Sequence, residues 1–167
     1  MTSKHFKYLT YVLKHKWFVF AECCKFGIPW RGLVHDLSKL RPSEWIPYVN
    51  YFYGDFPETL TVYEKIYHWK MKNKAVIESE FDIAWLKHQK RNKHHWQYWI
   101  LREDNGETKV IKMPLKYVKE MLADWIGAGI AITGKREVKT WYLKNKEKMI
   151  LHKETREWIE RLLEVGK

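Results

Sequence analysis

The chain has 167 residues, of which 46% are hydrophobic and 31% charged. This balance suits one folded domain with a substantial core and excludes a disordered chain. Thirty-one Lys and Arg against twenty Asp and Glu leave a net charge of +11. Such a field attracts anions, including nucleotides and nucleic acid, but it does not indicate a fold.

The two cysteines and the N-terminal charges bear on where the protein works. Cys23 and Cys24 are adjacent, so we expect no disulfide framework and a reducing, cytoplasmic setting. Lysines interrupt the first 16 residues, so we expect no signal peptide. No uncharged stretch approaches the length of a membrane span, so we expect no membrane partner.

Hydrophobic periodicity and stop signals predict helices over most of the chain. The turn signal Asp104-Asn105-Gly106, set between apolar stretches, predicts a β-hairpin over about 97–113. The predicted fold is therefore mostly α, a single helical domain over 1–167 with one small hairpin. The expected helices cover about 4–25, 31–40, 44–53, 62–77, 79 onward to about 99, 114–132, 136–150 and 153–165, with a loop at 54–61.

Two ionisable residues lie on apolar helix faces. His15 shares its face with apolar residues one turn before and after it, Tyr11, Val12, Phe18 and Val19. Asp124 lies within the apolar run 121–126, and the small residues 127–129 that follow would let another helix approach closely. A carboxylate is almost never buried unless it is paired or bound to a metal.

Two histidine clusters complete the pattern. His35 and Asp36 follow Leu33-Val34, and neighbours on a helix diverge by about 100°, so both reach one metal only if the helix meets it obliquely. His88 and His95 are seven residues apart and face the same way on an unbroken helix. His94 then points away by roughly 120°, unless the helix breaks near Asn92.

Imidazole and carboxylate together suit Zn, Mn, Fe, Co or Ni, and we expect one or two such ions. Each residue alone has an ordinary explanation. His15 could be a core histidine, Asp124 could pair with Arg or Lys, and His94-His95 could belong to a solvated basic face. Together these explanations require several unrelated coincidences in one helical domain, so the metal site is favoured.

The order His…His-Asp…Asp resembles the HD superfamily of metal-dependent phosphohydrolases. The segments His35-Asp36-Leu37-Ser38-Lys39, His88…Asn92-Lys93-His94-His95 and Ala123-Asp124-Trp125 are similar to small, uncharacterised HD-like proteins of phages and bacteria, over roughly 9–130. The resemblance implies that the first metal is held by His15, His35, Asp36 and Asp124. It also implies that Asp36 bridges to a second metal, with His88, His95 and His94 as further ligands.

The resemblance implies a phosphohydrolase in which a metal activates water and Asp36 and Lys39 serve catalysis. Lys39 lies one turn from the His-Asp pair and would offer charge to a phosphate. Weaker candidates for substrate contact are Arg31, Arg91 and Asn92, and Glu44 or Asn92 could orient a ligand or water. Charge and analogy favour a nucleotide or cyclic nucleotide as the substrate.

Two other functions remain open. Some two-metal HD proteins with a similar ligand pattern use di-iron to oxidise small molecules with oxygen. A nucleic-acid-binding module without catalysis could use the basic stretches 65–74 and 87–93, which are interleaved with Tyr67, Trp69 and Trp85. This alternative leaves the expected burial of Asp36 and Asp124 unexplained.

Overall fold

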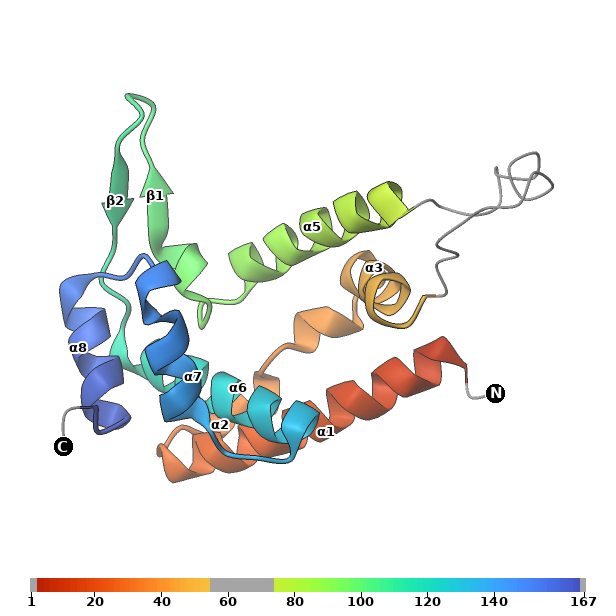
Figure 1. Cartoon of the computed structure of the whole chain (residues 1–167), viewed down its shortest axis with the longest axis horizontal. Coiled ribbons are helices and arrows are strands. Elements are labelled where there is room, and N and C mark those ends of the chain that lie inside the picture. Colours follow the sequence, from red (N-terminus) through yellow and green to blue (C-terminus); the bar gives the residue numbers. More distant parts are fainter. Residues whose placement is uncertain (1–2, 55–73, 166–167) are drawn as a thin grey trace. The chain divides into compact units, whose positions relative to one another are not determined.

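The computed structural model describes residues 3–54 and 74–165. The described residues form a mostly helical fold with a small two-stranded hairpin, which confirms the predicted fold class (Figure 1). The predicted loop at 54–61 and the helix at 62–77 lie largely outside the described residues. None of the helices in the described ranges is long and apolar enough to cross a membrane.

The chain divides into two compact units, each built from two separate stretches. The first unit contains residues 1–10 and 37–88, and the second contains 11–36 and 89–167. The chain passes from one unit to the other within a helix at 10–11 and at 88–89, and within a turn at 36–37.

The first unit has an aromatic core. It contains the start of α1 (Lys4–Lys25), the 3-10 turn Leu37–Leu40, α3 (Pro42–Tyr53) and most of α5 (Lys74–Arg91). Tyr51 stacks on Phe81 with ring centroids 4.0 Å apart, and buried Tyr8 packs edge-on against Trp45. These contacts tie α3 to α5 and to the start of α1.

The second unit is organised around α6 (Leu115–Thr133), which carries the greatest share of its buried residues. The other elements are the rest of α1, α2 (Pro29–Val34), β1 (Ile100–Arg102), β2 (Thr108–Val110), α7 (Val138–Asn145) and α8 (Lys153–Leu162). The main core cluster comprises Met113, Val118, Met121, Leu122, Tyr142, Met149 and Ile159. This core holds α6 firmly against α7 and α8.

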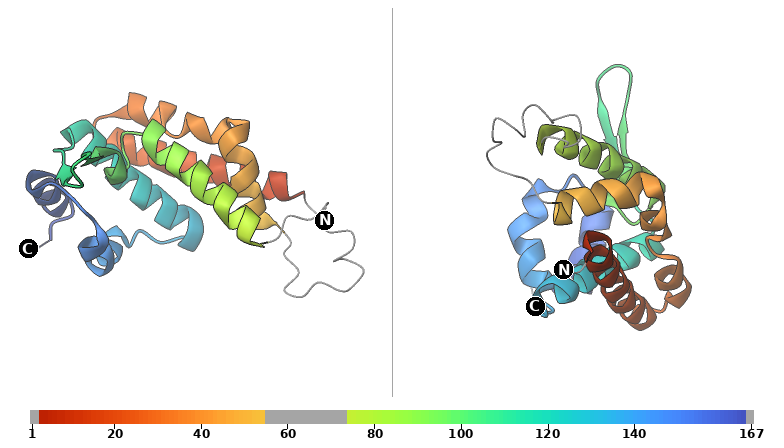
Figure 2. Two further views of the ribbon diagram at one scale, coloured as in Figure 1. Left: turned by 90° about the horizontal axis from the view of Figure 1, so that it is seen from above. Right: turned by 90° about the vertical axis from the view of Figure 1, so that its right-hand side faces the viewer.

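Within this unit, α6 approaches α1 very closely, and Figure 2 shows the two helices from further sides. A Cβ added at Gly127 would lie 2.6 Å from Cγ2 of Val19 and 2.9 Å from its backbone nitrogen, so only glycine fits. Lys14 of α1 also donates a hydrogen bond to the carbonyl of Ala131, at 3.1 Å. The prediction that small residues after Asp124 admit a neighbouring helix is confirmed.

Several predicted boundaries are confirmed. The first helix covers Lys4–Lys25 as expected, and α6 ends at Gly134, whose φ of 76° is the left-handed cap that glycine favours. The hairpin pairs Ile100 with Val110, and Gly106 occupies its turn with φ 88°. Its strands are shorter than predicted because residues 96–99 form a 3-10 turn.

Two predicted helices are interrupted, and both interruptions involve the candidate ligands. The helix expected over 31–40 ends at Val34, and Asp36 adopts a left-handed conformation with φ 53°. At this break, the ammonium of Lys16 donates a hydrogen bond to the backbone carbonyl of His35 at 2.5 Å, so this carbonyl has a partner although the helix has ended. The helix expected to continue from 79 to about 99 ends at Arg91.

Candidate metal centre

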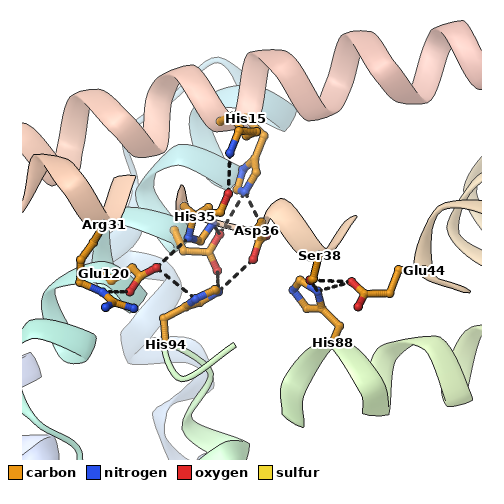
Figure 3. Close-up of polar contacts among 11 residues, drawn as sticks. His15, Arg31, His35, Asp36, Ser38, Glu44, His88, His94 and Glu120 are labelled. Atoms are coloured by element: carbon orange, nitrogen blue, oxygen red, sulfur yellow. Dashed lines mark hydrogen bonds and ion pairs between the residues drawn. The ribbon is translucent and has the colours of Figure 1, made fainter. Parts of the chain in front are cut away.

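Four buried or nearly buried side chains of the second unit converge on one point. His15 comes from α1, His35 and Asp36 from the break after α2, and Asp124 from α6. Nε2 of His15 lies 3.2 Å from Oδ1 of Asp124 and 3.9 Å from Oδ2 of Asp36. Nε2 of His35 lies 3.3 Å from the same Asp36 oxygen (Figure 3). It also lies 3.4 Å from the same Asp124 oxygen.

These distances fit the donor set of a transition metal. A metal about 2.0–2.2 Å from each of four tetrahedral ligands keeps the ligand atoms roughly 3.3–3.6 Å apart. The side chains of His15, His35 and Asp36 are no more than 2% exposed, and that of Asp124 is 14% exposed. Two imidazoles and two carboxylates in this arrangement could hold a metal ion.

The pKa values of two of these buried groups, His35 and Asp124, are shifted by their close contacts with one another. Burial lowers the pKa of His35, but the charge of Asp36 and hydrogen bonds to Asp124, Asp36 and Glu120 raise it well above its usual value. Burial raises the pKa of Asp124, but hydrogen bonds from His15 and His35 hold it well below its usual range. Without a metal, the raised pKa of His35 favours a proton on its ring that balances the carboxylates, so a cation binding here displaces that proton.

Glu120 is a site residue that sequence reasoning missed. It is 2% exposed, and Oε1 lies 3.2 Å from Nδ1 of His35 and 3.4 Å from Nδ1 of His94. Its burial raises the pKa, but hydrogen bonds from the two histidines lower it to about 2. The sequence carried a signal, because Glu120 lies one helical turn before Asp124 and shares its face.

The histidines after α5 follow the second of the two predicted arrangements, in which the helix breaks near Asn92. Because α5 ends at Arg91, His94 turns inward and is 2% exposed. Its role as a metal ligand stays a prediction. Its Nε2 lies 3.4 Å from Oδ1 of Asp36 and 3.8 Å from Oδ2 of Asp124. His95 is also buried, and ligand atoms of Asp36, His94 and His95 lie within 4.8 Å of one another.

His88 lies in the first unit, in a polar cluster of its own. Its Nδ1 lies 2.8 Å from Oε2 of Glu44 and 3.2 Å from Oγ of Ser38, which donates to the same glutamate at 2.8 Å (Figure 3). Glu44 thus orients His88. The expectation that His88 shares a second metal with Asp36 and His95 stays a prediction.

The sequence pattern of one protein family matches residues 4–165, nearly the whole chain. The chain belongs to DUF5662, a family of unknown function. Comparison with curated proteins gives no match, and neither does comparison with solved structures. Every residue of the candidate centre lies within the DUF5662 match, but the family assigns no reaction to them.

The residues predicted to contact substrate lie on different segments of the chain. Arg31 pairs with Glu120 and lies 4.2 Å above the ring of Tyr117. Lys39 lies in the 3-10 turn after the His-Asp pair, Arg91 is the last residue of α5, and Asn92 follows it. Their substrate contacts stay predictions. The basic stretch 65–74 lies almost entirely outside the described residues, and 87–93 covers the end of α5.

Proposed function

We propose that this protein is a metal-dependent phosphohydrolase of the HD type that acts on a nucleotide or cyclic nucleotide. The observation that carries the proposal is the convergence of His15, His35, Asp36 and Asp124 at 3.2–3.9 Å from three separate segments. A purely structural cluster of this kind costs free energy because it buries ionisable groups. A divalent ion would offset that cost through direct ligation.

The strained backbone of Asp36 supports a functional role. A non-glycine residue at φ 53° lies in the left-handed region, which costs of order 1–3 kcal/mol and persists only where the surroundings impose it. This conformation brings Asp36 to the same point as His35. Strain of this kind concentrates at functional sites.

The chemistry follows from the donor set. A divalent metal held there would lower the pKa of a bound water toward neutrality and supply the nucleophile for phosphate-ester hydrolysis. His15 and His35 would present Nε2 lone pairs to such a metal, and Asp36 and Asp124 would contribute the negative charge that favours a divalent ion. Asp36 and Asp124 each direct their second oxygen toward His94, so the same carboxylates could serve a neighbouring ion.

The charge of the chain supports an anionic substrate. The net charge of +11 raises the local concentration of phosphate compounds. Lys39 follows Asp36 by three residues, and its ammonium would pair with a phosphoryl oxygen. A phosphate ester would use both the metal-activated water as nucleophile and the lysine as its charge partner.

The test is to purify the protein, count its metals, and measure phosphate release from nucleoside monophosphates and cyclic nucleotides. We expect one or two equivalents of a transition metal, loss of activity with a chelator and recovery on adding metal back. Metal-free protein whose melting temperature does not rise with Zn, Mn, Fe, Co or Ni would overturn the metal centre. Bound iron with oxygen consumption and no phosphate release would replace hydrolysis with oxidation.

A further inference from the structure

We infer that Glu120 is a positioning residue that holds two metal-facing histidines, His35 and His94, in their ligating orientation. This inference rests on the proposed metal centre but assigns a residue that the ligand pattern does not contain. Glu120 lies on α6, one turn from Asp124, and its carboxylate is buried behind both imidazoles (Figure 3).

The contacts define what each nitrogen does. Oε1 of Glu120 accepts from Nδ1 of His35 at 3.2 Å and from Nδ1 of His94 at 3.4 Å. With a metal bound, Nδ1 of each ring would keep its proton and donate it to Glu120, which leaves Nε2 as the lone pair for the metal. For His35, Nε2 is the nitrogen that lies 3.3 Å from Oδ2 of Asp36.

The same geometry indicates that Glu120 positions the histidines and does not itself bind the metal. Glu120, His35 and His94 could together hold an ion through the opposite ring nitrogens. However, Oε2 of Glu120 already accepts from Nε of Arg31, whose guanidinium lies over the Tyr117 ring. A guanidinium at this carboxylate disfavours a second cation there, whereas it fixes a carboxylate that only accepts hydrogen bonds.

The carboxylate of Glu120 therefore supports two candidate ligands, His35 and His94. His35 belongs to the group with His15 and Asp124, and His94 lies at the opposite oxygens of Asp36 and Asp124. Removing Glu120 should loosen both rings at once, although neither loses a donor atom. Loss of such an orienting partner typically lowers metal affinity by 10–100-fold.

The experiment compares Glu120→Ala and Glu120→Gln with Glu22→Gln. Glu22 is a matched control because it is also a buried glutamate of this unit, paired with Arg136 at 2.5 Å and Lys25 at 2.6 Å, with no histidine partner among its hydrogen bonds and ion pairs in the described residues. We expect zinc affinity to fall about 10–100-fold in Glu120→Ala and less in Glu120→Gln, whose amide oxygen still accepts from Nδ1. Glu22→Gln should change only the melting temperature.

A structural readout distinguishes positioning from ligation. X-ray absorption of the zinc-loaded Glu120→Gln protein should show the same number of nitrogen and oxygen ligands as wild type, and imidazole NMR should show a disturbed Nδ1–H pattern at His35 and His94. Loss of an oxygen ligand would make Glu120 a ligand. Zinc affinity in Glu120→Ala equal to that of Glu22→Gln would also overturn the inference, whereas wild-type protein that binds no metal would overturn the proposed centre itself.

Discussion

The candidate centre draws its side chains from two kinds of segment. His15 and Asp124 lie on long regular helices, α1 and α6, which are locked together at Gly127. The remaining residues lie where helices end: His35 and Asp36 after α2, and His94 and His95 after α5. A regular helix separates adjacent side chains by about 100°, whereas a break lets two neighbours converge on one point.

The breaks are supported by specific interactions. Lys16 donates to the carbonyls of Leu33 and His35, at 3.5 and 2.5 Å, where α2 leaves them without helical partners. The carboxylate of Glu120 contacts Nδ1 of both His35 and His94, the ring nitrogens that face away from Asp36. The regular helices therefore determine where the centre lies, and the helix ends bring several candidate ligands together at that point.

The largest effect is expected from Asp36→Asn. Asparagine tolerates the left-handed backbone, so the break persists while the charge and the strong ligand are lost. We expect metal affinity to fall by more than about 100-fold, because losing a ligand costs more than losing an orienting partner. Metal content after dialysis measures this effect, with Asp82→Asn on the exposed face of α5 as the control. Equal metal content in the two variants would remove Asp36 from the centre.

The second break is tested by His94→Ala and His95→Ala. Because α5 ends at Arg91 and both rings are buried, either substitution should cost the second equivalent of metal and spare the first. Elemental analysis of each variant gives the stoichiometry. Lys93→Ala, at the exposed residue beside them, should match wild type. Unchanged stoichiometry in both variants and in His88→Ala would leave a one-metal centre.

Sequence reasoning found the parts of the site that regular helices determine. Periodicity alone placed His15 and Asp124 on apolar faces, and the small residues 127–129 indicated that another helix approaches closely, which the structure shows to be α1. These inferences depend only on spacing along one helix. The ends of α1 and α6 could also be predicted from the sequence, because Gly27 and Gly134 mark them, and both glycines adopt a positive φ.

The break after α2 could not be predicted in this way. The apolar pattern around His35 continues through Leu37 and Leu40, so periodicity favoured one helix over 31–40. What interrupts it is tertiary: Lys16 on another helix and the convergence of charges on Asp36. Glu120 was missed because a glutamate on a helix is usually solvated. Its place on the same face as Asp124 was a signal of burial, and its partners on other segments show that burial directly.

The contact between α1 and α6 is tested by Gly127→Ala. Alanine usually stabilises a helix interior by about 1 kcal/mol relative to glycine, but here its Cβ would meet Val19 at 2.6 Å. Overpacking should destabilise the protein by about 1–3 kcal/mol, and the melting temperature should fall by roughly 2–4 °C per kcal/mol. Metal affinity should fall as well, because the displacement separates His15 from Asp124.

Gly129→Ala is the matched control on the same helix. Its Cβ would meet only the Lys135 carbonyl oxygen, at 3.5 Å, which is an ordinary contact. We therefore expect an unchanged or slightly higher melting temperature and unchanged metal content. Equal shifts for the two variants would show that α1 and α6 do not depend on the Gly127 contact.

The smallest effect is expected from Lys39→Ala, just past the first break. Lys39 is not among the ligand groups of the described residues, so metal content should stay at the wild-type value. Loss of one charge-assisted contact to phosphate should weaken substrate affinity about tenfold, and the loss should shrink as salt screens the charge. Lys87→Ala on exposed α5 is the control, and both variants are compared by KM at low and high salt. An unchanged KM, or the same small change in both variants, would mean that the protein attracts phosphate through its general charge rather than through this lysine.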